Sequence, residues 1–501
     1  MSNLQKVTSS KSSLTGKEYK IPENINDREL IDGFIKKNIG KKVVVVKGLG
    51  FVGAVMSLIV ANALNEEYAV IGIDQATPQS YWKIISINEG SFPIISSDTK
   101  IDLFYTKSRE KGNFIATADS YAYTIADIII VDINLDVQKQ STPKKELLRY
   151  DVNLIPFKKA ASTIATYCKE DVLILVETTV PPGTCQHIVK PIFDEKFSER
   201  GLQLNYKLGH SYERVMPGPD YIDSIQNFYR VYSGIDEESA NATEKFLRTI
   251  ISTETYPLTR LNSTTATEMA KVMENSYRAM NIAFIQEWTN FAEDANVNLF
   301  KVVDAIRMRP THRNIMMPGL GVGGYCLTKD PLMASWAAQN IFSSKPLTQS
   351  EKAVSINDTM PHHSFSVIQK SLGHLDSKKI LMLGISYLSN VGDTRYTPTE
   401  LLYDLLIEQN SKVTVHDPFV PYWEEKQMKV NTSLSDVFNE TYDAILLCTA
   451  HDIYKNNPSL IQFIQQSHNC WVIDTNKVLS DSEVDILNTM CQLKVIGRGD
   501  I

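Results

Sequence analysis

The stretch Lys42-Val43-Val44-Val45-Val46-Lys47-Gly48-Leu49-Gly50-Phe51-Val52-Gly53 decides the fold of the first part of the chain. Its run of valines is typical of a strand that is buried on both faces of a parallel sheet. Three glycines follow at the spacing Gly-x-Gly-x-x-Gly and lead into small and apolar residues that predict a helix. Strand, glycine turn and helix in this order predict the opening unit of a doubly wound α/β domain.

Similar runs recur along the chain at helix-length intervals. They share apolar or β-branched composition and lie at residues 69–73, 127–131, 172–176, 379–383, 412–415, 444–447 and 471–473. Residues 263–296 differ, because they are free of Gly and Pro and carry apolar residues at helical spacing. A shorter helix is expected at 299–308, and another ends near residue 372. The predicted plan is therefore α/β, a helical middle, and α/β again.

Composition excludes several classes of protein. The 501 residues are 43% hydrophobic and 22% charged with a net charge of -7, so the basic face of a nucleic-acid binder is not expected. No apolar run approaches the roughly 20 residues that span a bilayer, and the polar N-terminus is not that of a secretory signal. The six cysteines lack metal-type or disulfide-type spacing, so we expect no metal and a reducing cytoplasm.

The glycine turn has the sequence context of a dinucleotide site. Asp74 ends the next predicted strand, 21 residues after Gly53. An acid at that place accepts hydrogen bonds from the ribose hydroxyls of NAD and disfavours the extra phosphate of NADP. A plain strand-to-helix turn is the alternative for the glycines alone. We expect NAD, with these cofactor-binding residues: Gly48, Gly50, Phe51, Val52, Gly53 and Asp74.

One cysteine lies behind a run of glycines in the segment 319–330, Gly-Leu-Gly-Val-Gly-Gly-Tyr-Cys-Leu-Thr-Lys-Asp. Glycines let the backbone approach a ligand closely. Cys326 is followed three and four residues later by Lys329 and Asp330, and a neighbouring cation favours the thiolate. Taken alone, the segment is also compatible with a tight turn around an inert thiol.

Polar residues elsewhere strengthen the case for catalysis. Lys271 and Asn275 are four residues apart on the predicted long helix and share a face, although a solvated helix face is the alternative for the pair alone. The segment 177–184 follows a predicted strand, where ligands bind in open α/β sheets. Glu213 lies in a loop that ends in Pro and Gly, and a solvated acid is its default interpretation.

Together these segments resemble the nucleotide-sugar 6-dehydrogenases, the family of the UDP-glucose, UDP-N-acetylhexosamine and GDP-mannose dehydrogenases. The similarity runs from about residue 41 to 499. It is carried by Gly48–Gly53, Thr178–Gly183, Tyr212–Gly218, Lys271 with Asn275, Gly323–Asp330 and Gly392–Arg395. The Glu-Arg-Val-x-Pro-Gly segment is closest to the UDP-N-acetylhexosamine branch.

The resemblance implies a fold of two Rossmann-like doubly wound domains joined by a long central helix and a helical middle domain. We expect a polar N-terminal extension over residues 1–40, with a short helix near 27–37, and an NAD-binding domain over 41–235. A helical middle domain would follow over 236–345, and a nucleotide-sugar-binding domain over 346–501. The implied partners are a UDP-sugar and a second copy of the chain, dimerised through the helical middle. The implied pathway makes surface polysaccharide precursors.

The family oxidises the C6 alcohol of a nucleotide sugar to a carboxylate with two NAD. By resemblance, Asp330 is the base for the first step, through a water that is held with Lys271. Lys271 and Asn275 stabilise charge on the oxygen, and Cys326 forms a thiohemiacetal and then a thioester. Glu213 activates the water that hydrolyses the thioester, and Thr179 positions that water.

Further contacts are implied in the same way. Thr179 and Arg395 would also contact the cofactor, Arg395 from the Asp-Thr-Arg segment of the C-terminal domain. Backbone amides of residues 318–324 would contact the diphosphate. The expected substrate-binding residues are Glu213, Arg214, Lys271, Asn275, Gly323, Gly324 and Tyr325.

The chain departs from the family pattern at three places. Leu388 replaces a Lys or Arg of many relatives and cannot bind a phosphate. The residues after the third strand are Asp132-Ile133-Asn134 in place of Thr-Pro, so the contacts on the nicotinamide side differ. Tyr325 replaces Ser or His beside the nucleophile, which leaves the hexose open.

Two other functions are compatible with parts of the pattern. A two-electron β-hydroxyacid dehydrogenase also has a Rossmann domain, a long helix and Lys-x-x-x-Asn, but it needs neither Cys326 nor a second α/β domain. A catalytically silent protein that binds NAD or a nucleotide sugar would have no need of a thiol and acids in register.

Overall fold

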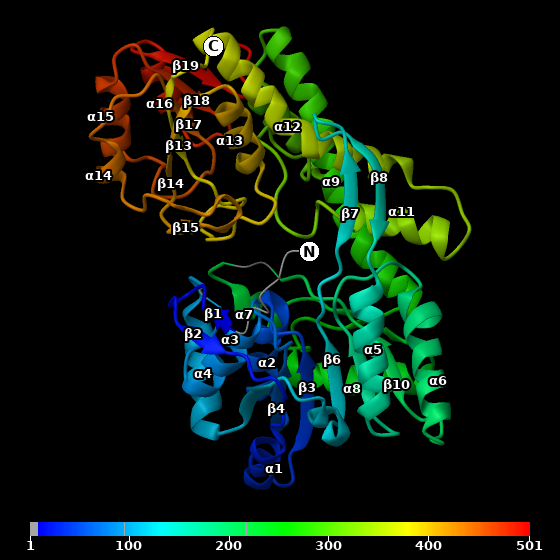
Figure 1. Cartoon of the computed structure of the whole chain (residues 1–501). Coiled ribbons are helices and arrows are strands. Elements are labelled where there is room, and N and C mark those ends of the chain that lie inside the picture. The colour runs from blue at the N-terminus through cyan, green and yellow to red at the C-terminus, as the bar shows by residue number, and fades with distance from the viewer. Residues whose placement is uncertain (1–8, 95, 216–217) are drawn as a thin grey trace, which may run out of the picture. The chain divides into compact units, whose positions relative to one another are not determined.

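The structure is a computed structural model that describes residues 9–94, 96–215 and 218–501. Residues 1–8 of the expected extension, and Met216 and Pro217 of the Tyr212–Gly218 segment, lie outside the described residues. The chain divides into two compact units (Figure 1). Unit 1 comprises Met1–Asp136, Val152–Val272 and Asn340–Phe342; unit 2 comprises Val137–Asp151, Met273–Gln339 and Ser343–Ile501. The four-part division expected from the sequence stays a prediction.

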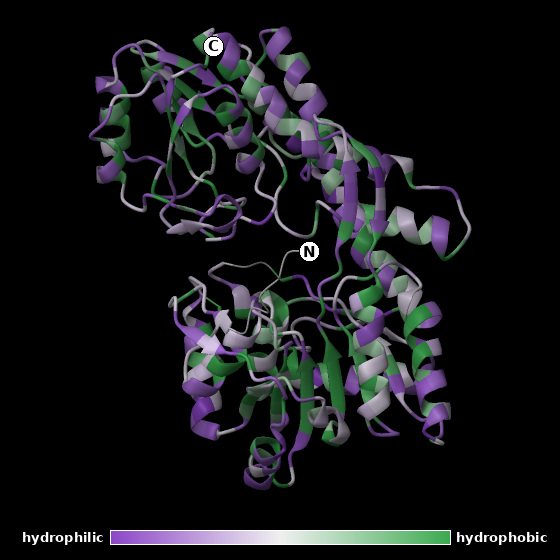
Figure 2. Ribbon diagram, viewed as in Figure 1, coloured by the Kyte–Doolittle hydropathy of each residue, from purple (hydrophilic) through white to green (hydrophobic). Residues whose placement is uncertain are grey.

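Unit 1 is built on a mostly parallel sheet. Its strands, in spatial order, are β12 (Thr259–Arg260), β11 (Val231–Gly234), β10 (Lys207–His210), β9 (Leu173–Val176), β6 (Ile128–Val131), β3 (Lys42–Lys47), β4 (Tyr68–Ile73) and β5 (Phe114–Thr117). Only the β10–β11 pairing in this sheet, as described, is antiparallel. The valines of β3 and all of β4 are buried, and these strands are apolar in Figure 2.

Helices cover this sheet. They are α2 (Phe51–Ala61), α3 (Tyr81–Glu89), α4 (Thr99–Lys111), α5 (Ile155–Tyr167), α6 (Lys190–Glu199), α7 (Tyr221–Gln226) and α8 (Glu237–Ile250), with short helical turns at Ser120–Ile125 and Cys185–Val189. Helix α2 is apolar almost all round, because it is buried between the sheet and helices α4 and α7. The strand order reverses at β3, between β4 and β6, and this switch point is where a doubly wound sheet binds its ligand.

The N-terminal extension is part of unit 1. It forms the antiparallel hairpin β1 (Ser9–Lys11) and β2 (Glu18–Lys20), followed by α1 (Arg28–Lys37). The short helix predicted near residues 27–37 is confirmed, whereas the hairpin was not predicted. Ile31 and Phe34 of α1 are buried, so the extension contributes to the core despite its polar composition.

Unit 2 contains a second, entirely parallel sheet. Its strands, in spatial order, are β14 (Lys412–His416), β13 (Lys379–Leu383), β17 (Ala444–Leu447), β18 (Trp471–Asp474) and β19 (Gln492–Val495). Its helices are α10 (Leu299–Arg307), α11 (Asp330–Asn340), α12 (Thr348–Leu372), α13 (Pro398–Glu408), α14 (Leu434–Val437), α15 (Pro458–Gln466) and α16 (Asp481–Leu487), with short turns at Pro310–His312 and Glu424–Lys426. The strand order again reverses, between β13 and β17. Both Rossmann-like sheets predicted from the sequence are confirmed.

Two further hairpins and one long helix complete the architecture. The hairpin β15 (Tyr422–Trp423) and β16 (Met428–Lys429) lies near β14 in sequence, and β7 (Val137–Ser141) pairs with β8 (Leu147–Val152). Tyr150 of β8 donates to Glu351 of α12 at 2.5 Å, so the second hairpin packs on unit 2. Helix α9 (Thr264–Asp294) passes from unit 1 into unit 2 and matches the predicted long helix.

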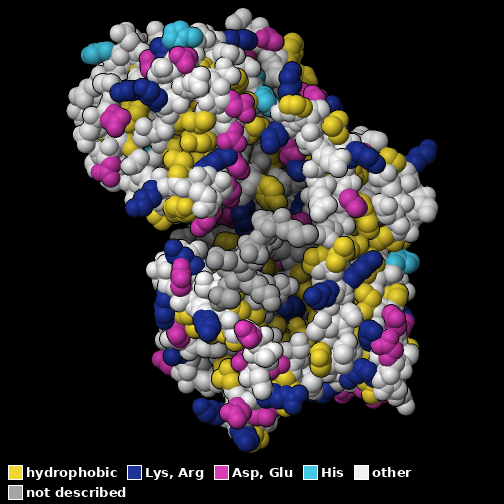
Figure 3. All heavy atoms as spheres, viewed as in Figure 1, with side chains coloured by type: hydrophobic (Ala, Val, Ile, Leu, Met, Phe, Trp, Pro, Cys, Tyr) yellow, Lys and Arg dark blue, Asp and Glu magenta, His cyan; other side chains and the backbone are white. Residues whose placement is uncertain are grey.

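The surface shows no segregation of charge on the face drawn in Figure 3. Lys and Arg side chains are interspersed with Asp and Glu on each unit. None of the helices described here has the length and apolar character needed to cross a membrane. Within the same described residues, no group of three or more His, Cys, Asp and Glu is arranged to hold a metal ion.

Candidate active site

The glycine turn after β3 is closed so tightly that two of its glycines are required by the fold. Gly48 has a φ of +107°, and a Cβ there would lie 2.1 Å from the carbonyl oxygen of Asp132. A Cβ on Gly53 would lie 2.0 Å from the carbonyl oxygen of Gly48. A Cβ on Gly50 would meet no atom of the protein within 4 Å. The fold itself therefore does not require a glycine at position 50. This is expected where the protein backbone approaches the pyrophosphate of a dinucleotide closely.

Asp74 joins the end of β4 to this turn. Its Oδ2 accepts a hydrogen bond from the Leu49 amide at 3.2 Å, and its Oδ1 accepts one from the Gln75 amide at 2.7 Å. The ammonium of Lys83 is 4.0 Å away. An open glycine, the first-turn amides of α2 and an acid at the end of β4 are the groups that a dinucleotide needs, so these residues fit NAD.

The loop that carries Thr179 is held by a buried acid. Glu268 of α9 accepts hydrogen bonds from the amides of Gly183 at 2.6 Å and Cys185 at 2.8 Å. Burial raises the pKa of Glu268 to about 7, although the backbone donors oppose the shift. The Cys185 thiol is fully buried, which fits a structural role. Sequence reasoning did not single out Glu268, because its partners lie more than 80 residues away.

Lys271 and Glu213 form a charge pair in unit 1, although they are 58 residues apart in sequence. Lys271 Nζ donates to the Glu213 carbonyl oxygen at 2.7 Å and lies 3.6 Å from its carboxylate. The Glu213 carboxylate also accepts a hydrogen bond from the Val215 amide. Both side chains are almost buried, so Glu213 is not the solvated acid of the default interpretation.

Other ionisable groups are buried at the same edge of the sheet. The Glu177 carboxylate pairs with the Arg230 guanidinium, both out of solvent. Burial, and then the Glu213 charge, raise the pKa of Asp132 to about 8, while Arg230 opposes the shift. Burial and Lys271 lower the pKa of His210 to about 3, so this imidazole is neutral and bonds Thr267 at 2.7 Å. The Asp132 departure thus places an acid at the switch point.

In unit 2, Cys326 is exposed while the acid four residues later is buried. Asp330 accepts a hydrogen bond from Asn275 Nδ2 at 2.7 Å and pairs with Lys329 Nζ at 2.9 Å. The Lys329 ammonium also lies 4.4 Å from the centre of the Tyr325 ring. The buried thiol of the alternative interpretation is therefore wrong, and the contact between Asn275 and Asp330 is one that the sequence did not predict. The water link from Asp330 to Lys271 stays a prediction.

Arg395 supplies a second cation beside the cysteine segment. Its guanidinium pairs with Asp393 at 2.6 Å and lies 5.8 Å from the centre of the Tyr325 ring. Burial alone would lower the pKa of Arg395, but Asp393, Tyr387 and the Cys326 thiol together raise it. The Gly324 amide donates to the Arg395 carbonyl oxygen at 3.0 Å, so Arg395 and the cysteine segment are in direct contact. The sequence pointed to Lys329 as the cation near the thiol, yet Lys329 is already paired with Asp330.

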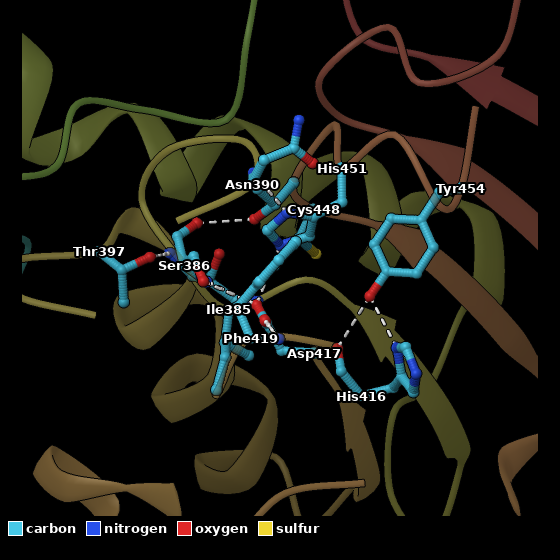
Figure 4. Close-up of polar contacts among 12 residues, drawn as sticks. Ile385, Ser386, Asn390, Thr397, His416, Asp417, Phe419, Cys448, His451 and Tyr454 are labelled. Atoms are coloured by element: carbon cyan, nitrogen blue, oxygen red, sulfur yellow. Dashed lines mark hydrogen bonds and ion pairs between the residues drawn. The ribbon is translucent and has the colours of Figure 1, made fainter. Parts of the chain in front are cut away.

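The loop that carries Arg395 is anchored by a buried acid and imidazole (Figure 4). Asp417, at the end of β14, accepts hydrogen bonds from the Ile385 amide at 2.9 Å and the Ser386 amide at 3.0 Å. His451 lies 3.1 Å from the same carboxylate, and its Nδ1 accepts from the Asn390 amide at 2.8 Å. Burial would raise the pKa of Asp417, but His451 and the amides lower it. Asp417 is therefore an ionised anchor, which the sequence did not reveal.

The remaining predicted substrate residues are placed as follows. Arg214 donates to the Tyr229 carbonyl oxygen at 3.0 Å and to the Tyr212 hydroxyl at 3.2 Å. Leu388, which replaces a Lys or Arg of many relatives, is exposed and places an apolar side chain at the surface. The roles of all the predicted site residues remain proposals.

Three family models match the chain in order. They are the NAD binding domain of the UDP-glucose/GDP-mannose dehydrogenase family over residues 41–251, its central domain over 265–359, and its UDP binding domain over 381–481. The chain belongs to the UDP-glucose/GDP-mannose dehydrogenase family. It is an NAD-dependent nucleotide-sugar dehydrogenase, as the resemblance implied.

Individual relatives cover almost the whole chain. A UDP-N-acetyl-D-mannosamine dehydrogenase from Methanocaldococcus jannaschii is 28% identical over 447 residues, which are 89% of this chain and 94% of the relative. A UDP-N-acetyl-D-glucosamine 6-dehydrogenase from Pseudomonas aeruginosa is also 28% identical, over 82% of this chain and 91% of the relative. These relatives confirm the branch expected from the sequence.

A solved structure agrees with these matches. The UDP-D-ManNAc dehydrogenase from Pyrococcus horikoshii superposes with a TM-score of 0.76 at 25% identity. The match covers 92% of this chain and 100% of that one. The likeness therefore extends over both units.

The glycine turn predicts a split between two alanine variants. Gly53→Ala should lower the free energy of unfolding by about 1–3 kcal/mol, because its Cβ meets the Gly48 carbonyl. Gly50→Ala should keep wild-type stability but bind NAD at least about tenfold more weakly, because its Cβ enters the ligand's space. Denaturant unfolding and calorimetric titration with NAD separate the effects. A destabilised Gly50→Ala variant would contradict the geometry.

Glu268 predicts a pH-dependent contribution to stability. Its pKa is raised in the folded state, so its contribution is complete below an unfolded pKa of about 4.5 and is lost as pH rises through about 7. Relative to Glu268→Gln, the wild type should lose about 2–3 kcal/mol of unfolding free energy between pH 5 and pH 8. Urea unfolding of both proteins measures this difference. A difference that does not change with pH would show that Glu268 titrates normally.

Proposed function

We propose that the protein oxidises the C6 alcohol of a UDP-N-acetylhexosamine to the uronate, in two two-electron steps at Cys326. The observation that carries the proposal is the exposed thiol on a glycine-lined segment that contacts the Arg395 backbone and leads into the buried Asp330–Asn275 pair. The names of the relatives make UDP-N-acetyl-D-mannosamine the first substrate to test. The cytoplasmic location and the polysaccharide pathway expected from the sequence stay predictions.

The first oxidation needs a base and stabilisation of negative charge on oxygen. Bound NAD supplies the hydride acceptor for both oxidations. Asp330 takes the proton of the C6 hydroxyl, and Asn275 holds the carboxylate in place by the 2.7 Å hydrogen bond between them. Lys271 is one helical turn from Asn275 on α9, and we assign it to the developing oxygen charge.

The second oxidation needs the sulfur. The Cys326 thiolate attacks the aldehyde carbon, and the carbonyl oxygen takes up a proton to give a thiohemiacetal. Loss of a hydride from that carbon and of the hydroxyl proton gives a thioester. We assign Arg395 to stabilising the thiolate before attack, because its guanidinium lies 5.8 Å from the ring of Tyr325, the residue before the sulfur. The covalent bond also keeps the aldehyde on the enzyme.

Hydrolysis releases the product. We assign Glu213 to the activation of the water and Thr179 to its position. Water adds to the thioester carbon, the carbon–sulfur bond breaks, the thiol is regenerated with a proton from the water, and the uronate is released. The Glu213 carboxylate is held by the Val215 amide and by Lys271, which fixes its direction. The overall reaction consumes one alcohol, one water and two NAD, and yields two NADH.

The alternatives predict different stoichiometry. A two-electron β-hydroxyacid dehydrogenase would form one NADH per substrate, and a silent binding protein would form none. The exposed thiol and the Arg395 guanidinium beside Tyr325 have no role in either alternative. Two NADH per UDP-sugar, with the uronate identified by mass, would support the proposed reaction.

The Cys326→Ser variant should lower net uronate formation at least about a thousandfold, because a hydroxyl is a poor nucleophile without a strong base. NAD affinity should be unchanged. Steady-state absorbance of NADH and calorimetric titration measure the two quantities. Cys491→Ser is the control, since its thiol bonds only the Leu487 carbonyl of its own helix end. Full turnover by Cys326→Ser would remove the thiol from the mechanism.

We further propose that two copies associate through α9, as the resemblance implied. Large apolar side chains recur along one face of this helix and are exposed in a single chain: Met273, Tyr277, Phe284, Trp288 and Phe291. A contiguous exposed apolar stripe of this length marks an interface. The spacing of three, four and seven residues keeps the stripe on one side of the helix.

The stripe predicts that Phe284→Glu gives a monomer, because a buried unpaired charge strongly disfavours association. Size exclusion with light scattering at micromolar concentration measures the mass. Asn290→Glu is the matched control, because it adds the same charge to an exposed position away from the stripe. A Phe284→Glu protein with the mass of a wild-type dimer would contradict the assignment, as would a monomeric wild type.

A further inference from the structure

The N-terminal extension lies outside the family models, the first of which begins at residue 41, yet it is built into unit 1. The side chains of Ser10 and Ser12 are buried, with exposed fractions of 0% and 2%. Figure 1 shows β1 and β2 beside α3, the helix that follows β4. The hairpin therefore packs against the helix that follows Asp74.

The hairpin supplies the missing cap of α3. Ser10 Oγ accepts a hydrogen bond from the Trp82 amide in the first turn of α3 at 3.0 Å, and donates to the Pro78 carbonyl oxygen at 2.7 Å. The residue at the N-cap position itself, Ser80, makes no side-chain cap. First-turn amides of a helix need such acceptors. Ser10 therefore fixes the loop that runs from Asp74 to α3.

A second contact of the extension reaches Asp74 through Thr117, on the neighbouring strand β5. Thr117, at the end of β5, donates from Oγ1 to the Asp27 carboxylate at 2.6 Å. The Asp27 amide donates in turn to the Asp119 carboxylate at 2.8 Å. The carbonyl oxygen of the same Thr117 accepts the Asp74 amide at 3.3 Å. Asp27 thus holds Thr117 at the end of β5, and Thr117 in turn holds the Asp74 backbone.

The helix α1 anchors the segment between these contacts and β3. Ile31 is fully buried and Phe34 is 5% exposed. Asn38, just after α1, donates to the Gly112 carbonyl oxygen at 3.0 Å. Because both its ends are fixed, the segment can restrict the motion of the loops it touches.

We propose that Ser9–Lys37 is a strap that holds the adenosine-ribose end of the NAD site. Ser10 and Asp27 are positioning residues in this proposal. They act on Asp74 through the loop before α3 and through Thr117, and so preserve its hydrogen bonds to the ribose hydroxyls and its discrimination against a 2′-phosphate. The proposal rests on the role proposed for Asp74.

The test uses the full-length chain with Ser10→Ala and Asp27→Ala combined. Calorimetric titration with ADP-ribose, NAD and NADP should show about tenfold weaker binding of ADP-ribose and NAD, since one buried and one half-buried hydrogen-bonding side chain are removed. The preference for NAD over NADP should fall. The affinity for UDP and the kcat with saturating NAD should stay at wild-type values, because the strap belongs to unit 1 and the family's UDP binding domain matches residues 381–481 of unit 2.

Two control variants separate positioning from general structure. Asp27→Asn keeps an acceptor for Thr117, so it should bind ADP-ribose like the wild type. Lys17→Ala removes an exposed ion pair with Glu89, 2.7 Å long, from the same hairpin, and should have no effect. Asp74→Ala serves as the reference, and should weaken ADP-ribose binding at least as much as the double variant.

The outcomes are distinct. If Asp74→Ala weakens ADP-ribose binding but the Ser10/Asp27 variant does not, the proposed role of the strap is wrong, while the ribose-binding role of Asp74 is supported. If Asp74→Ala binds ADP-ribose normally, the ribose site fails, and the strap fails with it. A double variant that loses ADP-ribose and UDP affinity together, with a lowered melting temperature, would show general destabilisation and also overturn the strap.

Discussion

The path of the backbone before Cys326 depends on the absence of side chains at Gly323 and Gly324. A Cβ on Gly323 would lie 2.4 Å from the Cβ of Tyr387, and one on Gly324 would lie 2.8 Å from its ring. The Gly324 amide donates to the Arg395 carbonyl oxygen at 3.0 Å. The edge of the C-terminal sheet therefore sets where the sulfur lies. Any side chain at these glycines would displace the segment that carries the thiol.

Three cations of the candidate site have carboxylate partners. Lys271 pairs with Glu213, Lys329 with Asp330, and Arg395 with Asp393. Burying such pairs gives little net stability, because desolvation offsets much of the attraction. Their retention fits chemistry that needs fixed charge at the moment of proton transfer.

Local patterns predicted the elements that local forces form. The buried strand β3, the glycine turn and helix α9 were predicted because their periodicity and glycine spacing have direct structural meaning. The four-residue strands β5 and β10 and the N-terminal hairpin were not, since they are short and partly polar. Partners such as Asp417 and His451 are 34 residues apart, and no spacing rule connects them. The sequence thus indicated candidate reacting groups, but not the buried residues that hold the loops around them.

The central claim is that a sulfur–carbon bond to the substrate forms during turnover. Acid quenching within the first turnovers with NAD and UDP-N-acetyl-D-mannosamine, followed by peptide mass mapping, tests it most directly. The account predicts a hydroxylamine-labile uronoyl adduct on the peptide that contains Cys326 and on no other cysteine peptide. Turnover to the uronate at full rate with no trace of that adduct, or with the adduct on another residue, would contradict it.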